Sequence, residues 1–183
     1  MNRLEKTRNL ILCALFAALT AVLSQIAIPI QPVPINLATF SVFVAGGVLG
    51  AKRGAISQAV YVLLGAVGLP VFSSFSGGMG ILFGPTGGYI VGYVAAAWLV
   101  GLLSARCHGK AYWFALSMAG GLALCYLLGT AWYMVVAHTG LVESLLLCVV
   151  PFLPGDAAKI AVAALLVPVL RKTLSKAGMA VSV

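Results

Sequence analysis

Acidic residues are scarce in this chain of 183 residues, with only Glu5, Glu143 and Asp156 present. Hydrolysis by a pair of carboxylates needs two acids at one site, and these three lie far apart in the sequence. The two histidines, His108 and His138, are isolated from each other, and neither belongs to a recognisable catalytic motif. The composition therefore argues against an enzyme, and we identify no catalytic residue.

Several nucleotide, metal and hydrolase motifs are also missing. The sequence contains no G-x-x-x-x-G-K-[ST], no H-E-x-x-H and no G-x-S-x-G. The four cysteines, Cys13, Cys107, Cys125 and Cys148, show no C-x-x-C spacing and lie in apolar or interfacial surroundings, so we interpret them as packing residues. We expect neither a metal nor a cofactor, and ATP hydrolysis by a Walker motif is excluded.

Charged residues of either sign are few. They make up 8% of the chain, whereas 62% is hydrophobic and the mean hydropathy is +1.13. Such values lie far outside the range of soluble domains and predict an all-α, polytopic membrane protein. The net charge of +8 could suggest nucleic acid, but the cations form short clusters between long apolar runs and are not interleaved with aromatic residues. The expected surroundings are therefore a lipid bilayer, and no nucleic-acid partner is predicted.

Six apolar stretches are long enough to be transmembrane helices, since a bilayer core needs about 20 residues. They cover residues 9–28, 34–51, 54–71, 85–103, 112–138 and 154–170. The first follows a basic N-terminus but continues without a small-x-small cleavage site, so we expect an uncleaved span and not a signal peptide. With no internal repeat and no long linker, residues 1–183 form one predicted transmembrane domain.

The positive charges predict the orientation of these spans. Ten of the eleven Lys and Arg residues fall at the N-terminus, after spans two and four, or after span six. The positive-inside rule then places both termini in the cytoplasm. We expect a multi-pass protein of the bacterial cytoplasmic membrane. The run at 141–151 is too short to cross, and its crossing would put the C-terminal cations outside, so we expect it along the outer face.

The two main non-cytoplasmic loops have unusual sequences. Residues 28–36 contain three prolines, which favour a stiff, extended backbone. Residues 72–89 are too apolar for a solvated loop and too rich in glycine for a regular helix. Irregular backbone at membrane depth is tolerated only where it is buried or lines a cavity, so these loops predict a cavity at the outer end.

Asp156 and Lys159 place a carboxylate and an ammonium inside the last apolar run. They are three residues apart, just after Pro154, so both side chains lie on one face near the start of a helix. Charged residues at this depth are a functional-site hypothesis by default. We interpret the pair as the floor of a binding site, and the alternative is a buried ion pair that only fixes helix packing.

The first span has four alanines at helical spacing, namely Ala14 with Ala18 and Ala17 with Ala21. Small residues four apart let two helices approach closely in lipid, where hydrophobicity does not drive association. The stripe therefore indicates either a contact with a partner subunit or packing inside the chain's own bundle.

Four segments together resemble one known family: 32–40 (PVPINLATF), 65–72 (GAVGLPVF), 83–89 (FGPTGGY) and 154–159 (PGDAAK). They are similar to the biotin-specific substrate-capture (S) components, the BioY family, of energy-coupling-factor (ECF) transporters, and the likeness covers nearly the whole chain. It implies a six-helix protein that binds biotin at its outer face with high affinity. It also implies a transmembrane coupling subunit and two ABC-type ATPases as partners.

The same resemblance implies roles for individual residues. The aspartate and lysine of the last segment hold biotin, and the two outer loops close the pocket, which gives the substrate-binding set Asp156, Lys159, Asn36, Thr39, Ser73, Ser74, Phe75, Gly77, Gly78, Thr86 and Tyr89. The alanines of the first helix contact the coupling subunit, which gives the partner-interface set Ala14, Ala17, Ala18 and Ala21.

The chemistry of biotin suggests how such a site would work. Asp156 would accept ureido N–H groups and Lys159 would donate to the ureido oxygen. Candidates for the apolar walls are Phe72, Phe75, Tyr89 and either Trp132 or Tyr133. With no arginine left for the biotin carboxylate, we expect it near solvent, held by the first loop or by residues 86–88.

Two other functions agree with the sequence. A stand-alone secondary transporter of biotin or a similar molecule would take up a proton on Asp156 in each cycle. A structural membrane scaffold would bind no small molecule at all.

Overall fold

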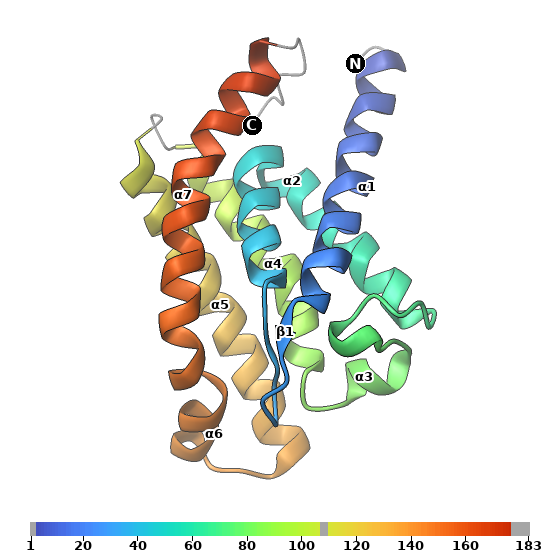
Figure 1. Cartoon of the computed structure of the whole chain (residues 1–183), viewed down its shortest axis with the longest axis vertical. Coiled ribbons are helices and arrows are strands. Elements are labelled where there is room, and N and C mark those ends of the chain that lie inside the picture. Colours follow the sequence, from blue (N-terminus) through green and yellow to red (C-terminus); the bar gives the residue numbers. More distant parts are fainter. Residues whose placement is uncertain (1–2, 107–109, 177–183) are drawn as a thin grey trace.

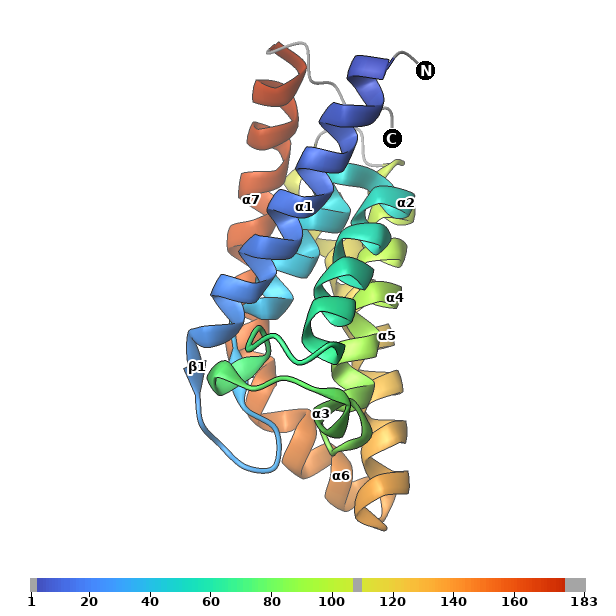
Figure 2. The ribbon, with the colours of Figure 1, turned by 90° about the vertical axis from the view of Figure 1, so that its right-hand side faces the viewer.

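Helices make up most of the chain, as the apolar composition predicts. The computed structural model describes residues 3–106 and 110–176, so Cys107 and His108 lie outside the described ranges. Figures 1 and 2 show long helices running along one axis, with both ends of the described chain at the same end of the bundle. The elements are α1 (Arg3–Gln25), β1 (Ala27–Ile28), β2 (Ile35–Asn36), α2 (Ala38–Ala66), η1 (Ser73–Phe75), α3 (Met79–Phe83), α4 (Gly87–Ser104), α5 (Ala111–Ala137), α6 (Leu141–Cys148), η2 (Val150–Phe152) and α7 (Leu153–Lys176).

Four helical stretches of the described chain are long and apolar enough to cross a bilayer: Glu5–Gln25, Gly87–Ser104, Ala111–Ala137 and Leu141–Lys176. The first three match predicted spans one, four and five, and the last contains span six together with α6. Helices α1 and α7 continue beyond the predicted spans to Arg3 and Lys176, because hydropathy marks the part of a helix that lies in lipid and not where the helix ends.

Predicted spans two and three correspond to the two halves of α2, although the helix begins at Ala38 and ends at Ala66, inside the predicted limits of 34 and 71. The helix is broken at Gly50, where φ is 79° and ψ is 177°, and the second half turns back along the first (Figure 1). A positive φ of this size favours glycine, and a Cβ on Gly54 would lie only 2.9 Å from the Cα of Gly46. The turn was expected after Ala51, so the break comes one residue earlier than predicted.

The first outer loop is a short hairpin. Strands β1 and β2 pair antiparallel, with Ala27 opposite Asn36 and Ile28 opposite Ile35, and the Gln31–Pro32 peptide bond is cis. The extended backbone predicted from the prolines is thus present at both ends of this loop. The second loop is less regular and holds only η1 and the five-residue helix α3. Residues 141–151, predicted not to cross, form α6 and part of η2 at the same end of the molecule (Figure 2).

Among the described residues, the buried apolar side chains form two hydrophobic clusters. One, nearer the chain termini, includes Phe16, Phe43, Phe114 and Met118. Arg171 of α7 extends across it, donating to the carbonyl of Gly47 and to Ser104 Oγ, with its guanidinium 5.0 Å from the centre of the Phe114 ring. The other cluster surrounds the cavity described next and contains Tyr61, Phe72, Tyr89, Tyr93 and Tyr133. The polar chemistry of the outer half is therefore set among aromatic residues.

Candidate ligand-binding site

Asp156 and Lys159 form an ion pair inside the bundle. Their exposed fractions are 1% and 8%, and Lys159 Nζ lies 2.7 Å from Asp156 Oδ1. Both are on the first turns of α7, which starts at Leu153 directly after the 3-10 turn η2, so the spacing of three residues brings them to one face. The predicted proximity of the two groups is confirmed.

Further hydrogen bonds complete the pair. Lys159 Nζ also donates to the carbonyl of Asn36 at 2.5 Å and to Thr39 Oγ1 at 3.1 Å, which uses its three donors. Asp156 accepts from Thr39 Oγ1 at 3.1 Å and from the Tyr126 hydroxyl at 2.5 Å. Groups from the first outer loop, α2, α5 and α7 therefore meet at this point, and both buried charges are compensated.

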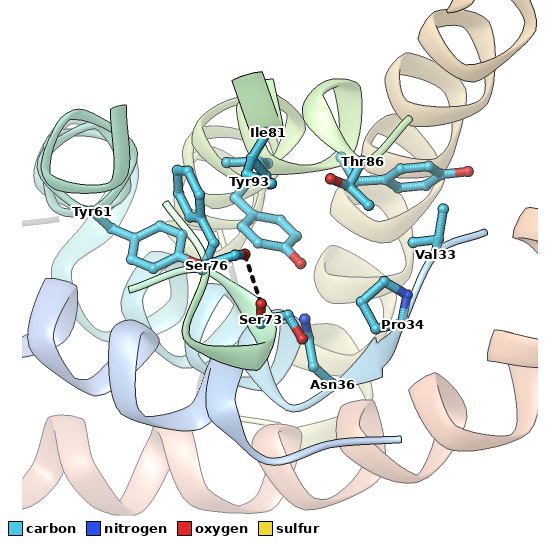
Figure 3. A pocket seen from close by; sticks show the side chains of 12 residues that line it. Val33, Pro34, Asn36, Tyr61, Ser73, Ser76, Ile81, Thr86 and Tyr93 are labelled. Atoms are coloured by element: carbon cyan, nitrogen blue, oxygen red, sulfur yellow. Dashed lines mark hydrogen bonds between the residues drawn. The ribbon is translucent and has the colours of Figure 1, made fainter. Parts of the chain in front are cut away.

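A cavity of about 210 Å³ opens beside the ion pair (Figure 3). Its walls are mostly apolar and include four aromatic rings, with a few polar groups from the two outer loops. The lining residues are Val33, Pro34, Asn36, Tyr61, Phe72, Ser73, Ser76, Ile81, Thr86, Tyr89, Ile90 and Tyr93.

A smaller cavity of about 30 Å³ adjoins the first and reaches the charged pair, lined by Val33, Pro34, Asn36, Thr39, Tyr89, Tyr93, Cys125, Tyr126, Phe152, Asp156 and Lys159. The two cavities share wall residues from the first loop and from α4, so they form one site with an aromatic part and a charged part. Apolar walls with a few placed polar groups are typical of small-molecule sites.

Glycines position two of the aromatic walls. A Cβ on Gly65 would lie 2.0 Å from the ring of Phe72, and a Cβ on Gly129 would lie 2.2 Å from the ring of Tyr89. These rings therefore pack directly on helix backbone. Phe72 also meets Tyr61 edge to face, with 5.6 Å between ring centres.

Most of the predicted binding residues meet at this site. Asn36, Ser73, Thr86 and Tyr89 line the larger cavity, and Asn36, Thr39, Tyr89, Asp156 and Lys159 line the smaller one. Four predicted residues line neither cavity: Ser74, Phe75, Gly77 and Gly78.

The backbone conformation explains why those four residues do not line the cavity. Ser74 and Phe75 have positive φ angles of 59° and 53°, and the Phe75 side chain is 73% exposed. Gly77 sits where a Cβ would lie 2.3 Å from the carbonyl oxygen of Leu69, and Gly78 has φ of 96°. These glycines fit the loop's conformation and do not line the cavity.

The other wall candidates fall in different places. Tyr133 is buried in the cluster around the site, whereas Trp132 donates to the carbonyl of Gly84. Trp132 lines a separate apolar cavity of about 190 Å³ together with Gly87 and Gly88. Of the expected segment 86–88, only Thr86 therefore faces the larger cavity.

Three tyrosines and a serine of the site were not predicted: Tyr61, Tyr93, Tyr126 and Ser76. Tyr93 lies one helical turn after Tyr89, and this spacing places both on one face of α4. Figure 3 shows the Tyr93 hydroxyl directed into the cavity. A hydroxyl-bearing aromatic in the middle of an apolar helix needs a polar partner, but this signal does not say which partner, so it does not by itself place Tyr126 at the site.

The alanines of α1 divide into two faces. Ala14 and Ala18 are exposed, Ala17 is 1% exposed within the cluster around the site, and Ala21 is partly buried against the same cluster. Ala14 and Ala18 therefore remain available for a contact outside the bundle, whereas Ala17 and Ala21 pack inside it.

The site can bind a neutral polar group between its two charges. An ionised carboxylate accepts N–H donors and an ammonium donates to a carbonyl oxygen, so a planar group that carries both would match the pair. A molecule without such a group would displace hydrogen bonds and leave the charges uncompensated, which is the main source of selectivity in buried polar sites.

Comparisons with known proteins agree on one family. The sequence profile of the BioY family matches residues 1–176. The chain is 42% identical over 165 residues to the biotin transporter BioY of Thermotoga maritima, covering 90% of this chain and 96% of the relative. It is 40% identical over 171 residues to the biotin transporter BioY of Rhizobium etli, covering 87% and 91%.

A solved structure is similar over nearly the same length. The crystal structure at 2.1 Å of the S-component for biotin from an ECF-type ABC transporter superposes with a TM-score of 0.87 at 29% identity, covering 94% of this chain and 95% of that one. The profile, the sequence relatives and the fold therefore all place this chain in the BioY family.

Proposed function

We propose that this chain is the biotin-capture component, or S component, of an ECF-type vitamin importer. The observation that carries the proposal is the buried Asp156–Lys159 pair beside an aromatic cavity, in a chain whose BioY relatives are named biotin transporters. Biotin has a planar ureido group with two N–H donors and one carbonyl, an apolar sulfur-containing ring, and an alkyl chain ending in a carboxylate.

In the proposed complex the ureido group binds at the charged part of the site. Asp156 accepts a ureido N–H and Lys159 donates to the ureido oxygen, replacing contacts that the two groups make within the protein. The ring and alkyl chain lie against Phe72, Tyr89 and Tyr93, and the carboxylate lies toward Thr86 and the first loop.

The membrane topology and the partner subunits follow from the same proposal. The protein crosses the bacterial cytoplasmic membrane six times as a single domain, with α1, the two halves of α2, α4, α5 and α7 as spans and both termini in the cytoplasm. The cavity then faces outward, since it lies at the end of the bundle opposite the termini (Figure 1). Transport requires a membrane-embedded coupling subunit, contacted by Ala14 and Ala18, and two ABC-type ATPases.

Calorimetric titration of the purified chain tests the proposal. Biotin should bind with high affinity. Desthiobiotin keeps the ureido group, so it should bind only somewhat more weakly, whereas an analogue without that group should not bind. Absence of biotin binding would refute the proposal. In liposomes the chain alone should bind biotin without accumulating it, and accumulation driven by a proton gradient would instead support a stand-alone transporter.

A further inference from the structure

One wall of the larger cavity is built from a strained segment. Phe72, Ser73 and Ser76 line the cavity, while Ser74 and Phe75 between them both adopt left-handed backbone conformations. Residues other than glycine pay a conformational cost there and keep such angles only where surrounding contacts impose them. The position of this wall therefore depends on what holds residues 71–76 in place.

Two of those contacts are internal to the segment. The Phe72 N–H donates to the carbonyl of Ser76 at 2.9 Å, and Ser76 Oγ donates to the carbonyl of Ser73 at 2.7 Å (Figure 3). They close the ends of the turn. Neither involves the N–H of Phe75 or the carbonyls of Val71 and Phe72.

The last turn of α1 provides further hydrogen bonds to this segment. Gln25 Oε1 accepts the Phe75 N–H at 2.8 Å, and Gln25 Nε2 donates to the carbonyls of Phe72 at 3.0 Å and Val71 at 3.2 Å. Ser24 Oγ, which is buried, donates to the same Val71 carbonyl at 2.6 Å. One side-chain amide thus holds both ends of the left-handed turn.

We propose that Gln25 is a positioning residue for ligand binding: it ties the outer end of α1 to residues 71–76, so that the cavity wall keeps its shape only while α1 is docked. Gln25 lies outside the cavity lining and acts through Phe72 and Ser73. The inference rests on the proposed function, because its test measures the affinity for biotin.

Thermodynamic linkage adds a consequence. If docking of α1 and closure of the wall are one equilibrium, docking of α1 strengthens ligand binding by a certain factor. The ligand then strengthens the docking of α1 by that same factor. Biotin should therefore slow hydrogen exchange both in residues 71–76 and in the last turn of α1.

The test compares Gln25→Leu with Gln31→Leu, a matched change at an exposed glutamine of the first loop. In the full chain in detergent or nanodiscs, Gln25→Leu should weaken biotin binding about tenfold to a hundredfold, since it removes three hydrogen bonds at once. Hydrogen exchange at the Phe75 amide should become fast in Gln25→Leu and stay slow in Gln31→Leu. Adding Ser74→Gly to Gln25→Leu should restore part of the affinity, because glycine adopts the left-handed turn without the penalty.

Native affinity of Gln25→Leu, or unchanged exchange at Phe75, would overturn the inference. Hydrogen exchange in α4 and α5 reports whether Gln25→Leu is folded. If it is not folded, Gln25→Glu is used to test the inference, because this change keeps the acceptor for the Phe75 N–H and removes both amide donors. If Gln25→Glu binds biotin more weakly while the Phe75 amide still exchanges slowly, the proposed role of Gln25 is supported. Unchanged biotin binding refutes it. If the unsubstituted chain does not bind biotin, the proposed function fails, and the exchange comparison alone decides whether Gln25 holds the wall.

Discussion

At the scale of single residues, the site consists of two charges and the groups that compensate them. Within the protein, Lys159 has three acceptors and Asp156 has three donors. A buried pair of this kind is strongly destabilised when one partner is removed, because the other charge is left alone. The same completeness means that a ligand must replace existing hydrogen bonds rather than fill empty positions.

Replacing either member of the pair should therefore weaken binding. Lys159→Met and Asp156→Asn each remove at least one charge-assisted hydrogen bond to the ureido group, worth ~1.5–3 kcal/mol, or about a tenfold to a hundredfold rise in the Kd for biotin. Calorimetry would measure it, with Lys172→Met at an exposed position of α7 as the control. Wild-type affinity in both site variants would show that the pair is not the floor of the pocket.

The charged residues of the site could be predicted from the sequence, whereas most of its aromatic residues could not. A carboxylate in an apolar run is costly enough to raise a functional-site hypothesis by itself. A tyrosine in such a run suits a cavity, a helix interface or the lipid boundary equally well, so Tyr61 and Tyr126 gave no distinct signal. Ser74 and Phe75 were included because their loop borders the cavity, but a left-handed turn directs them away from it.

At the scale of elements, close contact of rings with helix backbone sets the cavity's shape. Tyr89 of α4 packs on Gly129 of α5, and its hydroxyl lies 3.0 Å from Thr130 Oγ1. Space for that ring exists only because residue 129 has no side chain. The pairing of α4 with α5 is thereby part of the binding site.

Gly129→Ala should reduce biotin affinity by displacing Tyr89, since an added methyl would lie 2.2 Å from the ring. Overpacking of this kind costs ~1–3 kcal/mol, shared between folding stability and binding. Gly120→Ala on the same helix is the matched control, because its added methyl would meet only the end of the Leu103 side chain at 3.3 Å. Thermal unfolding with and without biotin would separate the two effects, and equal behaviour of both variants would contradict this account of the wall.

The two faces of α1 lead to a second prediction for an element. Ala18→Trp should leave biotin binding by the isolated chain intact and prevent copurification with the coupling subunit, because close helix contacts in lipid need small residues. Leu127→Trp, at an exposed position of α5, is the control. Loss of biotin binding with assembly preserved would mean that another surface contacts the partner. Ala17→Trp should instead disturb the fold, since Ala17 is buried.

The helices themselves could be predicted because long apolar runs mark them. Their ends, and the connections between them, depend on contacts that the sequence does not state. The helix α6 is an example: its length excluded a crossing, yet its helical form and the burial of Ser144 and Cys148 depend on the neighbouring α5 and η2.

At the scale of the whole molecule, ten of the eleven Lys and Arg residues lie toward the end of the bundle opposite the cavity, and the eleventh, Lys159, lines its charged part. In the proposed topology a fluorescent protein fused to either terminus should fluoresce, and alkaline phosphatase fused to either terminus should be inactive, because both termini lie in the cytoplasm. Phosphatase inserted at Gly140, between α5 and α6, should be active. An active C-terminal phosphatase fusion would rule out an even number of spans with a cytoplasmic N-terminus.

The break in α2 also has a consequence for how the chain is made. α2 has 29 residues and is broken at Gly50, so each half is shorter than the about 20 residues that a straight spanning helix needs. Lys52 and Arg53 lie just beyond the break, and moving either through the bilayer centre costs ~2.5–3.5 kcal/mol. During synthesis the two halves should therefore enter the membrane together as a hairpin with its turn held on the ribosome's side.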